Sequence, residues 1–278
     1  MGNLWNGLKH NRSFQICTLL VLILVLVAIF APEIAPYNPL RARMRDAFQA
    51  PSAAHIFGTD KLGRDLFSRI LCGTSYSLTS VLVLVAVIFV IGTTLGVVAG
   101  YFGGWYDTFI MRLSDMMISF PGMILAIAVA GVLGGSLINA MIALTIVTWT
   151  KYARLSRSMV LKVKKSVFVD AAIVNGGKPL HILMTHIVPN ILPLMVVTAA
   201  SDIGGLMMEL AGLSFLGFGS QPPAPEWGLL LNEGRAQFQS APWLMLFPGL
   251  AIFVTVVIFN LWGDALRDVL DPRQEGNS

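Results

Sequence analysis

The chain has 278 residues, of which 55% are hydrophobic and 12% are charged, and its mean hydropathy is +0.73. Because soluble domains carry about 25% charged residues, this composition excludes an ordinary soluble domain and indicates a membrane protein. The net charge of +4 is no signature of nucleic-acid binding. Cys17 and Cys72 lie far apart, and the four histidines lack paired spacing, so we expect neither a disulfide nor a metal centre.

Six apolar stretches are each suited to cross a bilayer as a helix, which takes about 20 mainly apolar residues. In chain order these are Phe14–Ala31, Leu78–Ala99, Met116–Leu133, Leu137–Trp149, Ile191–Phe215 and Trp243–Trp262. They predict an all-α, polytopic membrane protein with six transmembrane helices, the first of them uncleaved. We expect two parts: residues 1–75, with the first span and an extracytoplasmic loop, and a five-helix domain at residues 76–272. Pro121 and Pro248 lie inside spans and mark expected kinks.

The distribution of basic residues predicts the orientation, because cytoplasmic loops retain Lys and Arg. With the N-terminus inside, twelve of the 19 basic residues fall on the inside, and residues 151–178 alone hold seven of them against one acid. The first outside loop runs against this rule with six basic residues, although its four acids leave an excess of only two. These residues are Arg41, Arg43, Arg45, Lys61, Arg64 and Arg69, against Glu33, Asp46, Asp60 and Asp65. We therefore predict that both termini are cytoplasmic.

The inside segment 151–190 has the pattern of a helix, a sharp bend and a short second helix. Between Lys151 and Val174, apolar residues recur every four positions, as is typical of an amphipathic helix. The stripe consists of Leu155, Met159, Val163, Val167 and Ala171. Gly176-Gly177 ends this helix, and Lys178-Pro179 begins the next. The small side chains of Ala171 and Ala172 let a partner protein approach closely. Alternatively, the segment rests on anionic lipid headgroups, and physics alone favours neither interpretation.

Two further stretches lie on the outside, before the second span and after the fifth. "GTDKLGRDLFSR" (Gly58–Arg69) places Asp60/Arg64 and Asp65/Arg69 at i,i+4 spacing, which predicts an interfacial helix leading into the second span. In "FGSQPPAPEWG", the prolines exclude a helix and Trp227 suits the membrane interface. This second loop either faces a substrate-delivery protein or caps the fifth span, and both interpretations stay open.

Two acids lie inside the fifth predicted span. Asp202 and Glu209 are seven residues apart and therefore share one face of the helix. A carboxylate at bilayer depth faces a cavity or a partner, so the pair either lines a translocation path that attracts cationic groups or consists of hydrogen-bonded structural acids. The sequence shows no catalytic constellation and no GxxxxGK[ST] phosphate loop, so we expect no catalytic residues and no ATP hydrolysis by this chain.

The stretch "DAAIVNGG…HIVPNILP" resembles the EAA loop of ATP-binding-cassette (ABC) importer permeases. Asp170 stands where the family usually has Glu, and Ala171, Ala172, Gly176 and Gly177 follow. "GTDKLGRDLFSR", "AGLSFLGFGSQPPAPEWG" and the tail "NLWGDALRDVLDPR" are similar to the dipeptide/oligopeptide/nickel branch, and to its C-type permease in particular. The resemblance covers nearly the whole chain and implies a type I ABC importer permease fold in the bacterial cytoplasmic membrane.

The resemblance also implies a function and partners. The chain would be a permease subunit that translocates di- or oligopeptides, or nickel as a chelate. The loop at 170–177 would form a coupling helix that docks on an ATPase subunit. The implied partners are a second permease, two ATPase subunits that use ATP, an external substrate-binding protein and membrane lipid, and the chain itself holds no cofactor.

Two rival hypotheses belong to other classes. In an ion-coupled secondary transporter, Asp202 and Glu209 would carry protons, and the chain would work without an ATPase. A membrane anchor or assembly factor is a third possibility, which the two intramembrane acids disfavour.

Overall fold

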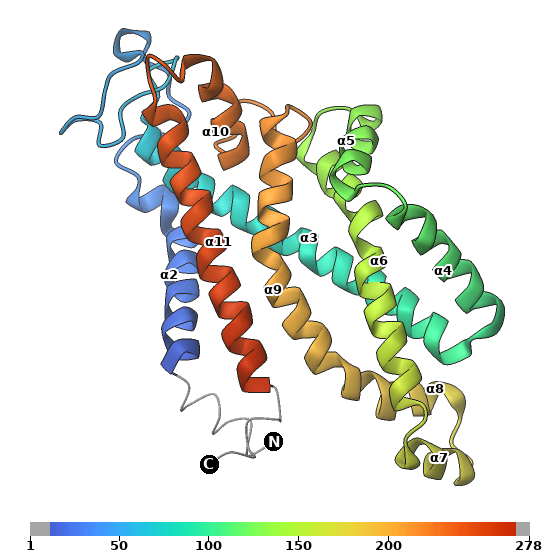
Figure 1. Cartoon of the computed structure of the whole chain (residues 1–278). Coiled ribbons are helices and arrows are strands. Elements are labelled where there is room, and N and C mark those ends of the chain that lie inside the picture. The colour runs from blue at the N-terminus through green and yellow to red at the C-terminus, as the bar shows by residue number, and fades with distance from the viewer. Residues whose placement is uncertain (1–11, 271–278) are drawn as a thin grey trace.

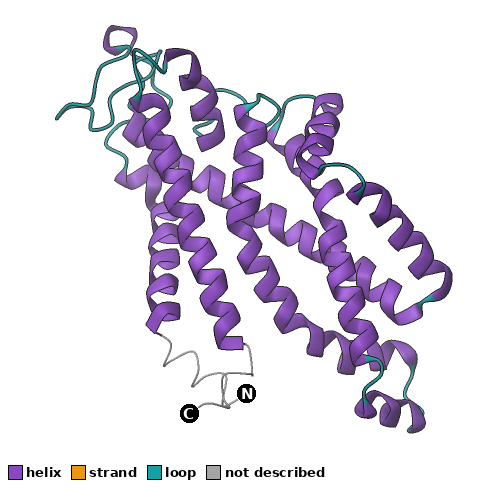
Figure 2. Ribbon diagram, in the orientation of Figure 1, coloured by secondary structure: helices purple, strands orange, loops and turns teal. Residues whose placement is uncertain are grey.

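The computed structural model describes residues 12–270, and within them the chain is helical without a β-strand, as Figure 2 shows. The helices are α2 (Arg12–Ile34), α3 (Leu66–Phe102), α4 (Gly104–Ile118), α5 (Gly122–Leu133), α6 (Leu137–Val163), α7 (Val167–Val174), α8 (Pro179–Ile182), α9 (Val188–Phe215), α10 (Trp227–Gly234) and α11 (Trp243–Leu270). A π-helical turn, Leu183–Ile187, joins α8 to α9. The all-α prediction is confirmed. Two of the twelve basic residues that were counted as inside, Lys9 and Arg273, lie outside the described residues. The start of the first predicted domain and the end of the second also lie outside them. The division at residue 75 stays a prediction.

The described helices form membrane-spanning elements, but six single spans are not confirmed as predicted. Four helical stretches are long and apolar enough to span: α2, α3, Pro179–Phe215 and Trp243–Val269. A fifth candidate is α4 with α5, a pair bent by 93°. The long helix α6 carries Lys151, Arg154 and Arg157 in its second half and is less apolar. Successive long elements run in alternating directions, with α4 and α5 together forming one passage (Figure 1).

The break between α4 and α5 replaces the straight span predicted at Met116–Leu133. Helix α4 ends at Ile118, and Pro121 stands immediately before α5 with an extended ψ of 120°. Proline has no N–H for a helical hydrogen bond, and it disfavours helical geometry at the residue before it. Pro121 therefore marks a corner and not a kink within one helix. Pro248 does lie inside α11.

Close packing of α3 on α6 organises the centre of the molecule. Gly92, Gly96 and Gly100 recur every four residues along α3 and face α6. A Cβ atom at Gly96 would fall on the Ser156 hydroxyl and the Ala153 carbonyl. Small residues at such spacing let two membrane helices approach until their backbones touch. At 37 residues, α3 is about 55 Å long. A bilayer core of about 30 Å therefore requires it to tilt, and it runs obliquely across the other helices (Figure 1).

Similar small residues join α9 to α11, and α2 flanks this pair. A Cβ at Gly204 would meet the Asn260 amide, and one at Gly263 would meet Ser201. The helices therefore pack closely beside Asp202, although Gly205 faces open space. At the edge, the Trp262 indole Nε1 donates a hydrogen bond of 3.1 Å to Thr18 of α2.

The α3–α6 contact predicts the effect of one methyl group. We expect Gly96→Ala to lower the free energy of unfolding by about 1–3 kcal/mol, because the added Cβ overpacks a backbone contact. Gly205→Ala is the matched control, since it adds the same methyl to a helix where nothing lies within 4 Å. Thermal unfolding of the two purified variants compares them, and equal unfolding midpoints would contradict the proposed role of the contact.

Candidate functional site

The predicted ATPase-coupling loop is a helix–turn–helix that projects from one end of the molecule. The first helix, α6, continues the fourth span to Val163, and the chain then turns at Lys164–Ser166 before α7 begins. The prediction of one unbroken helix from Lys151 to Val174 is therefore wrong at this turn. Ser166 has an extended backbone, and its hydroxyl donates 2.6 Å to the Val163 carbonyl, which fixes the interruption.

The bend after α7 follows the local chemistry of its residues. Gly176 adopts a φ of +77°, a left-handed conformation that glycine allows without strain. The Gly177 amide donates 3.0 Å to the Ala172 carbonyl, which closes the end of α7. Lys178 is extended, and Pro179 occupies the first turn of α8. The predicted glycine stop and proline restart are both present. The second helix runs on through Pro189 into α9 without ending there.

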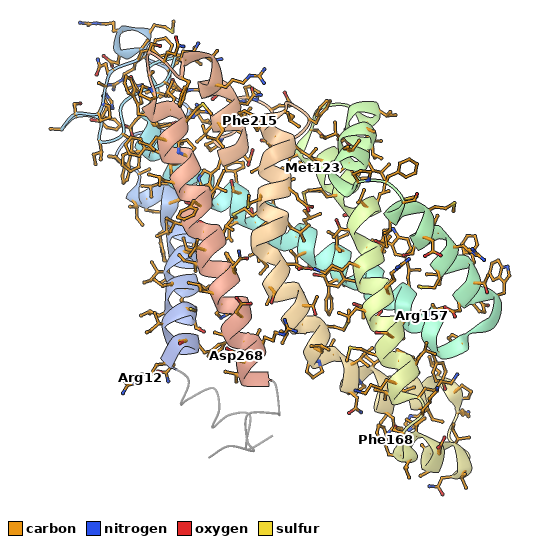
Figure 3. The ribbon with its side chains drawn as sticks, in the orientation of Figure 1. Arg12, Met123, Arg157, Phe168, Phe215 and Asp268 are labelled. Atoms are coloured by element: carbon orange, nitrogen blue, oxygen red, sulfur yellow. The ribbon has the colours of Figure 1, made fainter. Side chains whose placement is uncertain are left out.

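The exposed face of α7 differs from the predicted stripe. Val169 is fully buried, in a cluster with Val97, Val160 and Ile182, whereas Val167 is 84% exposed. Asp170, Ala171 and Gly176 are exposed, and Ala172 and Gly177 are half-buried. Large apolar side chains are exposed beside them, namely Val167, Phe168, Ile173, Val174 and Leu180. The loop therefore presents small and apolar residues outward, at the same end as Arg12 and Asp268 (Figure 3).

Helix α3 supports this loop from behind. The Tyr101 hydroxyl donates 2.8 Å to the Pro179 carbonyl at the start of α8. Lys164, in the turn before α7, donates 2.7 Å to the Tyr101 carbonyl. Both ends of the loop are thus tied to the last turn of α3, so that displacement of α7 acts on α3 as well as on α6.

Asp202 lies at the midpoint of α9, where its carboxylate pairs with a lysine. Lys151, at the midpoint of α6, approaches the two carboxylate oxygens at 2.7 and 2.9 Å, and the Tyr152 hydroxyl donates 3.0 Å to one of them. A cavity of 260 Å³ adjoins the pair. Glu209 is two turns further along α9, exposed, and has no hydrogen bond or ion pair among residues 12–270. The sequence analysis did not predict Lys151 as the partner of Asp202. The position of Lys151 just after the fourth predicted span was the signal that could have indicated it.

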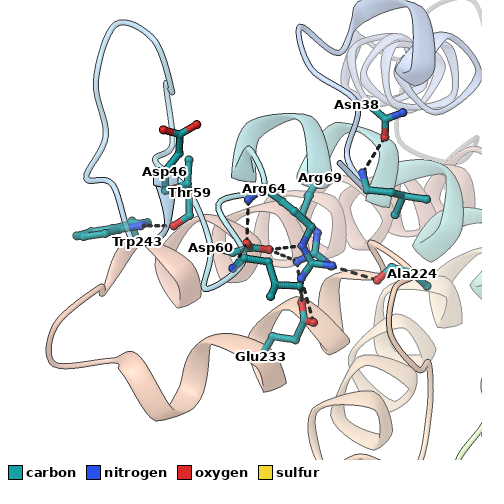
Figure 4. A network of polar contacts seen from close by, with 11 residues as sticks. Asn38, Asp46, Thr59, Asp60, Arg64, Arg69, Ala224, Glu233 and Trp243 are labelled. Atoms are coloured by element: carbon teal, nitrogen blue, oxygen red, sulfur yellow. Dashed lines mark hydrogen bonds and ion pairs between the residues drawn. The ribbon is translucent and has the colours of Figure 1, made fainter. Parts of the chain in front are cut away.

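At the opposite end, four charged side chains form a buried cluster that joins the loop before α3 to α10. Arg69 donates to Asp60 Oδ2 and Glu233 Oε2, both at 2.7 Å, and Arg64 donates to the same two acids at 2.6 and 3.1 Å (Figure 4). Arg69 is fully buried, Asp60 and Arg64 are nearly so, and only 10% of the Glu233 side chain is exposed. Two positive and two negative charges therefore compensate one another away from water.

This cluster corrects the prediction of an interfacial helix with two i,i+4 pairs. Asp60 and Arg64 do pair, but in a loop, since α3 begins only at Leu66. Asp65 does not pair with Arg69. Its carboxylate caps α3 through the Ser68 amide at 2.8 Å and contacts the His55 ring at 2.8 Å. Glu233 was not predicted, because it lies 164 residues from Arg69 in the sequence.

The loop before α10 is non-helical as predicted. Trp227, however, packs inside the protein and not at the membrane interface. The Trp227 side chain is buried, and its indole Nε1 donates 3.0 Å to the Ile70 carbonyl. The neighbouring Glu226 accepts from the Gly228 and Leu229 amides at 2.8 and 2.9 Å. Burial raises the pKa of the Glu226 carboxyl above its ordinary value, and these backbone hydrogen bonds oppose the rise. The loop thus seals α10 against α3.

The fold is similar to that of solved transporter structures. The chain matches solved structures described as inward-facing conformations of the MetNI methionine ABC transporter, with TM-scores of 0.55 and 0.53 at 19% and 21% identity. Each match covers 70% of this chain and 93% of the other. The fold is therefore that of a type I ABC importer permease.

The sequence comparisons then place the chain in a family. Residues 92–276 match "Binding-protein-dependent transport system inner membrane component", and residues 1–51 match "N-terminal TM domain of oligopeptide transport permease C". The chain belongs to the first family, which matches more than half of it. The dipeptide transport system permease protein DppC of Alkalihalophilus pseudofirmus is 42% identical over 96% of this chain and 88% of the relative. The glutathione transport system permease protein GsiD of Escherichia coli is 44% identical over 98% and 90%.

These findings settle the class of transport. The chain is a permease subunit of an ATP-driven ABC importer in the peptide branch, and the ion-coupled alternative is not supported. Nickel belongs to a related branch and is not named among these relatives.

The buried cluster predicts a large loss of stability when one charge is removed. Glu233→Gln leaves two buried arginines facing one carboxylate, and we expect it to cost about 3–5 kcal/mol of unfolding free energy. Lys61→Gln changes an exposed charge in the same motif and should cost less than about 0.5 kcal/mol. Thermal unfolding of both purified variants measures the difference, and a wild-type midpoint for Glu233→Gln would show that the cluster is not stabilising.

Proposed function

We propose that this chain carries short peptides across the bacterial cytoplasmic membrane as one of two different permease subunits in a complex with two ATPase subunits. Its relatives are named for dipeptide and glutathione transport, which supports a peptide substrate. The end that bears α7 is the cytoplasmic end, with both termini on the same side. Lipid surrounds the remaining apolar surface, and the partner subunits bind and hydrolyse the ATP.

The exposed apolar face of α7 carries the coupling part of the proposal. Val167 and Val174 are 84% and 85% exposed, although each has a large apolar side chain. Apolar residues gathered on a projecting loop indicate a protein interface. Asp170, Ala171, Ala172, Gly176 and Gly177 form its small central part, so a cleft in an ATPase subunit can close around it. This contact would transmit the ATPase movement to α3 and α6 through the Tyr101 and Lys164 bonds.

The two acids of α9 support a water-filled path beside this helix. Glu209 is exposed on a span, and an unpaired carboxylate at bilayer depth is too costly to face lipid. We therefore propose that the face of α9 with Asp202 and Glu209 lines the translocation path. A second permease would close the other side.

The outer end offers a basic surface suited to an acidic delivery protein. Asp60, Asp65 and Glu233 are buried or nearly so and are paired within the chain. The basic residues left exposed at this end are Arg41, Arg43, Arg45, Lys61 and Arg235. Burial removes Asp60 and Asp65 together with Arg64 and Arg69. The loop therefore exposes four basic residues against one exposed acid, Glu33, and the half-buried Asp46. Complementary charge accelerates docking between proteins.

The coupling proposal predicts the effect of a bulky residue on α7. Ala171→Trp should release the ATPase subunits from the detergent-purified complex and abolish peptide uptake, while the amount of folded chain stays unchanged because Ala171 is exposed. Ala236→Trp, an exposed alanine at the opposite end, should retain the ATPase subunits. Co-purification of the ATPase subunits measures both, and full retention by Ala171→Trp would refute the docking role of α7.

The basic surface makes a separate, salt-dependent prediction. Replacing Arg41, Arg43 and Lys61 together by Glu should slow association of the substrate-loaded delivery protein with the membrane complex about tenfold or more at low salt. The difference should shrink at high salt, because screening removes the attraction. Surface plasmon resonance on the reconstituted complex gives these rates. An association rate that does not change at low salt would mean that the delivery protein docks elsewhere.

A further inference from the structure

Three charged side chains from three helices surround the cavity next to Asp202. Lys151 comes from α6, Asp202 from α9 and Arg267 from α11, and Thr198 and Ser201 add hydroxyl groups to the lining. Lys151 and Asp202 are paired, whereas Arg267 is exposed and has no ion pair or hydrogen bond among residues 12–270. The cavity therefore has one positive charge in excess and would attract an anionic group.

The side chains of the Lys151–Asp202 pair differ in how freely they can move. The Lys151 side chain is 56% exposed, against 17% for Asp202, whose carboxylate is also held by the Tyr152 hydroxyl. Lysine has a long flexible stem, so it can leave the pair while Asp202 stays in place. The carboxylate would then face the cavity and need a new cation, because an unpaired charge at this depth is costly.

We propose that this cavity is a subsite for peptides with free termini, and that such a peptide exchanges partners with the Lys151–Asp202 pair. The peptide carboxylate binds between Lys151 and Arg267, and its terminal ammonium takes the place of Lys151 on Asp202. Lys151 and Asp202 then have partners both before and after binding, and Arg267 gains one on binding. The inference rests on the proposed peptide transport and adds the chemical class of substrate that this subunit selects.

The exchange explains how the subsite would discriminate among peptides. An N-acetylated peptide has no ammonium, so drawing Lys151 away leaves Asp202 unpaired. A C-terminal amide has no carboxylate to draw Lys151 away or to bind Arg267. Sites built on buried polar groups reject ligands that lack the matching group, because the site is then left unsatisfied. Thr198 and Ser201 carry hydroxyls that accept or donate hydrogen bonds to either terminus.

The test compares uptake of three peptides by the complete importer: free dialanine, N-acetyl-dialanine and dialanine amide. For each variant, uptake is divided by wild-type uptake of the same peptide, so that selection by the delivery protein cancels. We expect Asp202→Asn to reduce uptake of the free peptide at least tenfold more than uptake of the N-acetylated one. We expect Arg267→Gln to reduce uptake of the free and N-acetylated peptides more than uptake of the amide.

Two controls separate this proposal from a structural role for the pair. Asp264→Asn removes an exposed carboxylate that lies one turn from Arg267 and does not line the cavity, so it should leave the ratios unchanged. Combining Lys151→Asp with Asp202→Lys should restore the thermal stability lost in either single variant without restoring the wild-type ratios. A variant that lowers uptake of all three peptides equally would overturn the subsite. Failure of the wild-type importer to take up any peptide would instead overturn the proposed function.

Discussion

The contact on which the other features depend is the glycine-lined crossing of α3 and α6. Gly92, Gly96 and Gly100 let α6 lie directly on α3, and α6 carries Lys151 at its midpoint and leads into α7 at its end. The Lys151–Asp202 ion pair and the proposed coupling loop are therefore parts of one packed unit. A movement imposed on α7 reaches the cavity through a single helix, since only the short turn at Lys164–Ser166 lies between α7 and α6.

Burial gives the charged residues of this chain their different roles. At the end opposite α7, Asp60 and Glu233 are buried with two arginines, while Arg41 and Lys61 stay exposed. A sequence count treats all these charges alike, so the first outer loop conflicts with the expected distribution of basic residues. In the structure, two acids and two arginines of this loop are buried together, and Arg41, Arg43, Arg45 and Lys61 stay exposed. The same principle holds in the membrane region, where Asp202 is paired and Glu209 is exposed.

Local features were predictable from the sequence, and contacts between distant segments were not. The turn at Gly176 and the helix start at Pro179 follow from backbone restrictions of single residues, and the apolar spans follow from composition. The predicted apolar stripe through Val167 was wrong because the helix is interrupted at Ser166. A four-residue spacing counted across this interruption does not place residues on one helix face. Lys151 and Asp202 are 51 residues apart, and no local pattern links them. The family resemblance supplied the function of the chain. Physical patterns alone left the role of segment 151–190 divided between a surface for a partner protein and a surface that rests on lipid.

The buried charge cluster also bears on how this protein can be recombined with its relatives. Residues 1–51 match a separate N-terminal family, which suggests an exchangeable module. Yet Thr59 accepts a hydrogen bond from Trp243 through its carbonyl, and Asp60 shares Arg69 with Glu233. A chimera joined before Thr59 keeps these partners together, whereas one joined at the start of α3 separates residues that fold as a set. Charge pairing, and not the end of the first helix, therefore sets the latest point at which the segment can be joined.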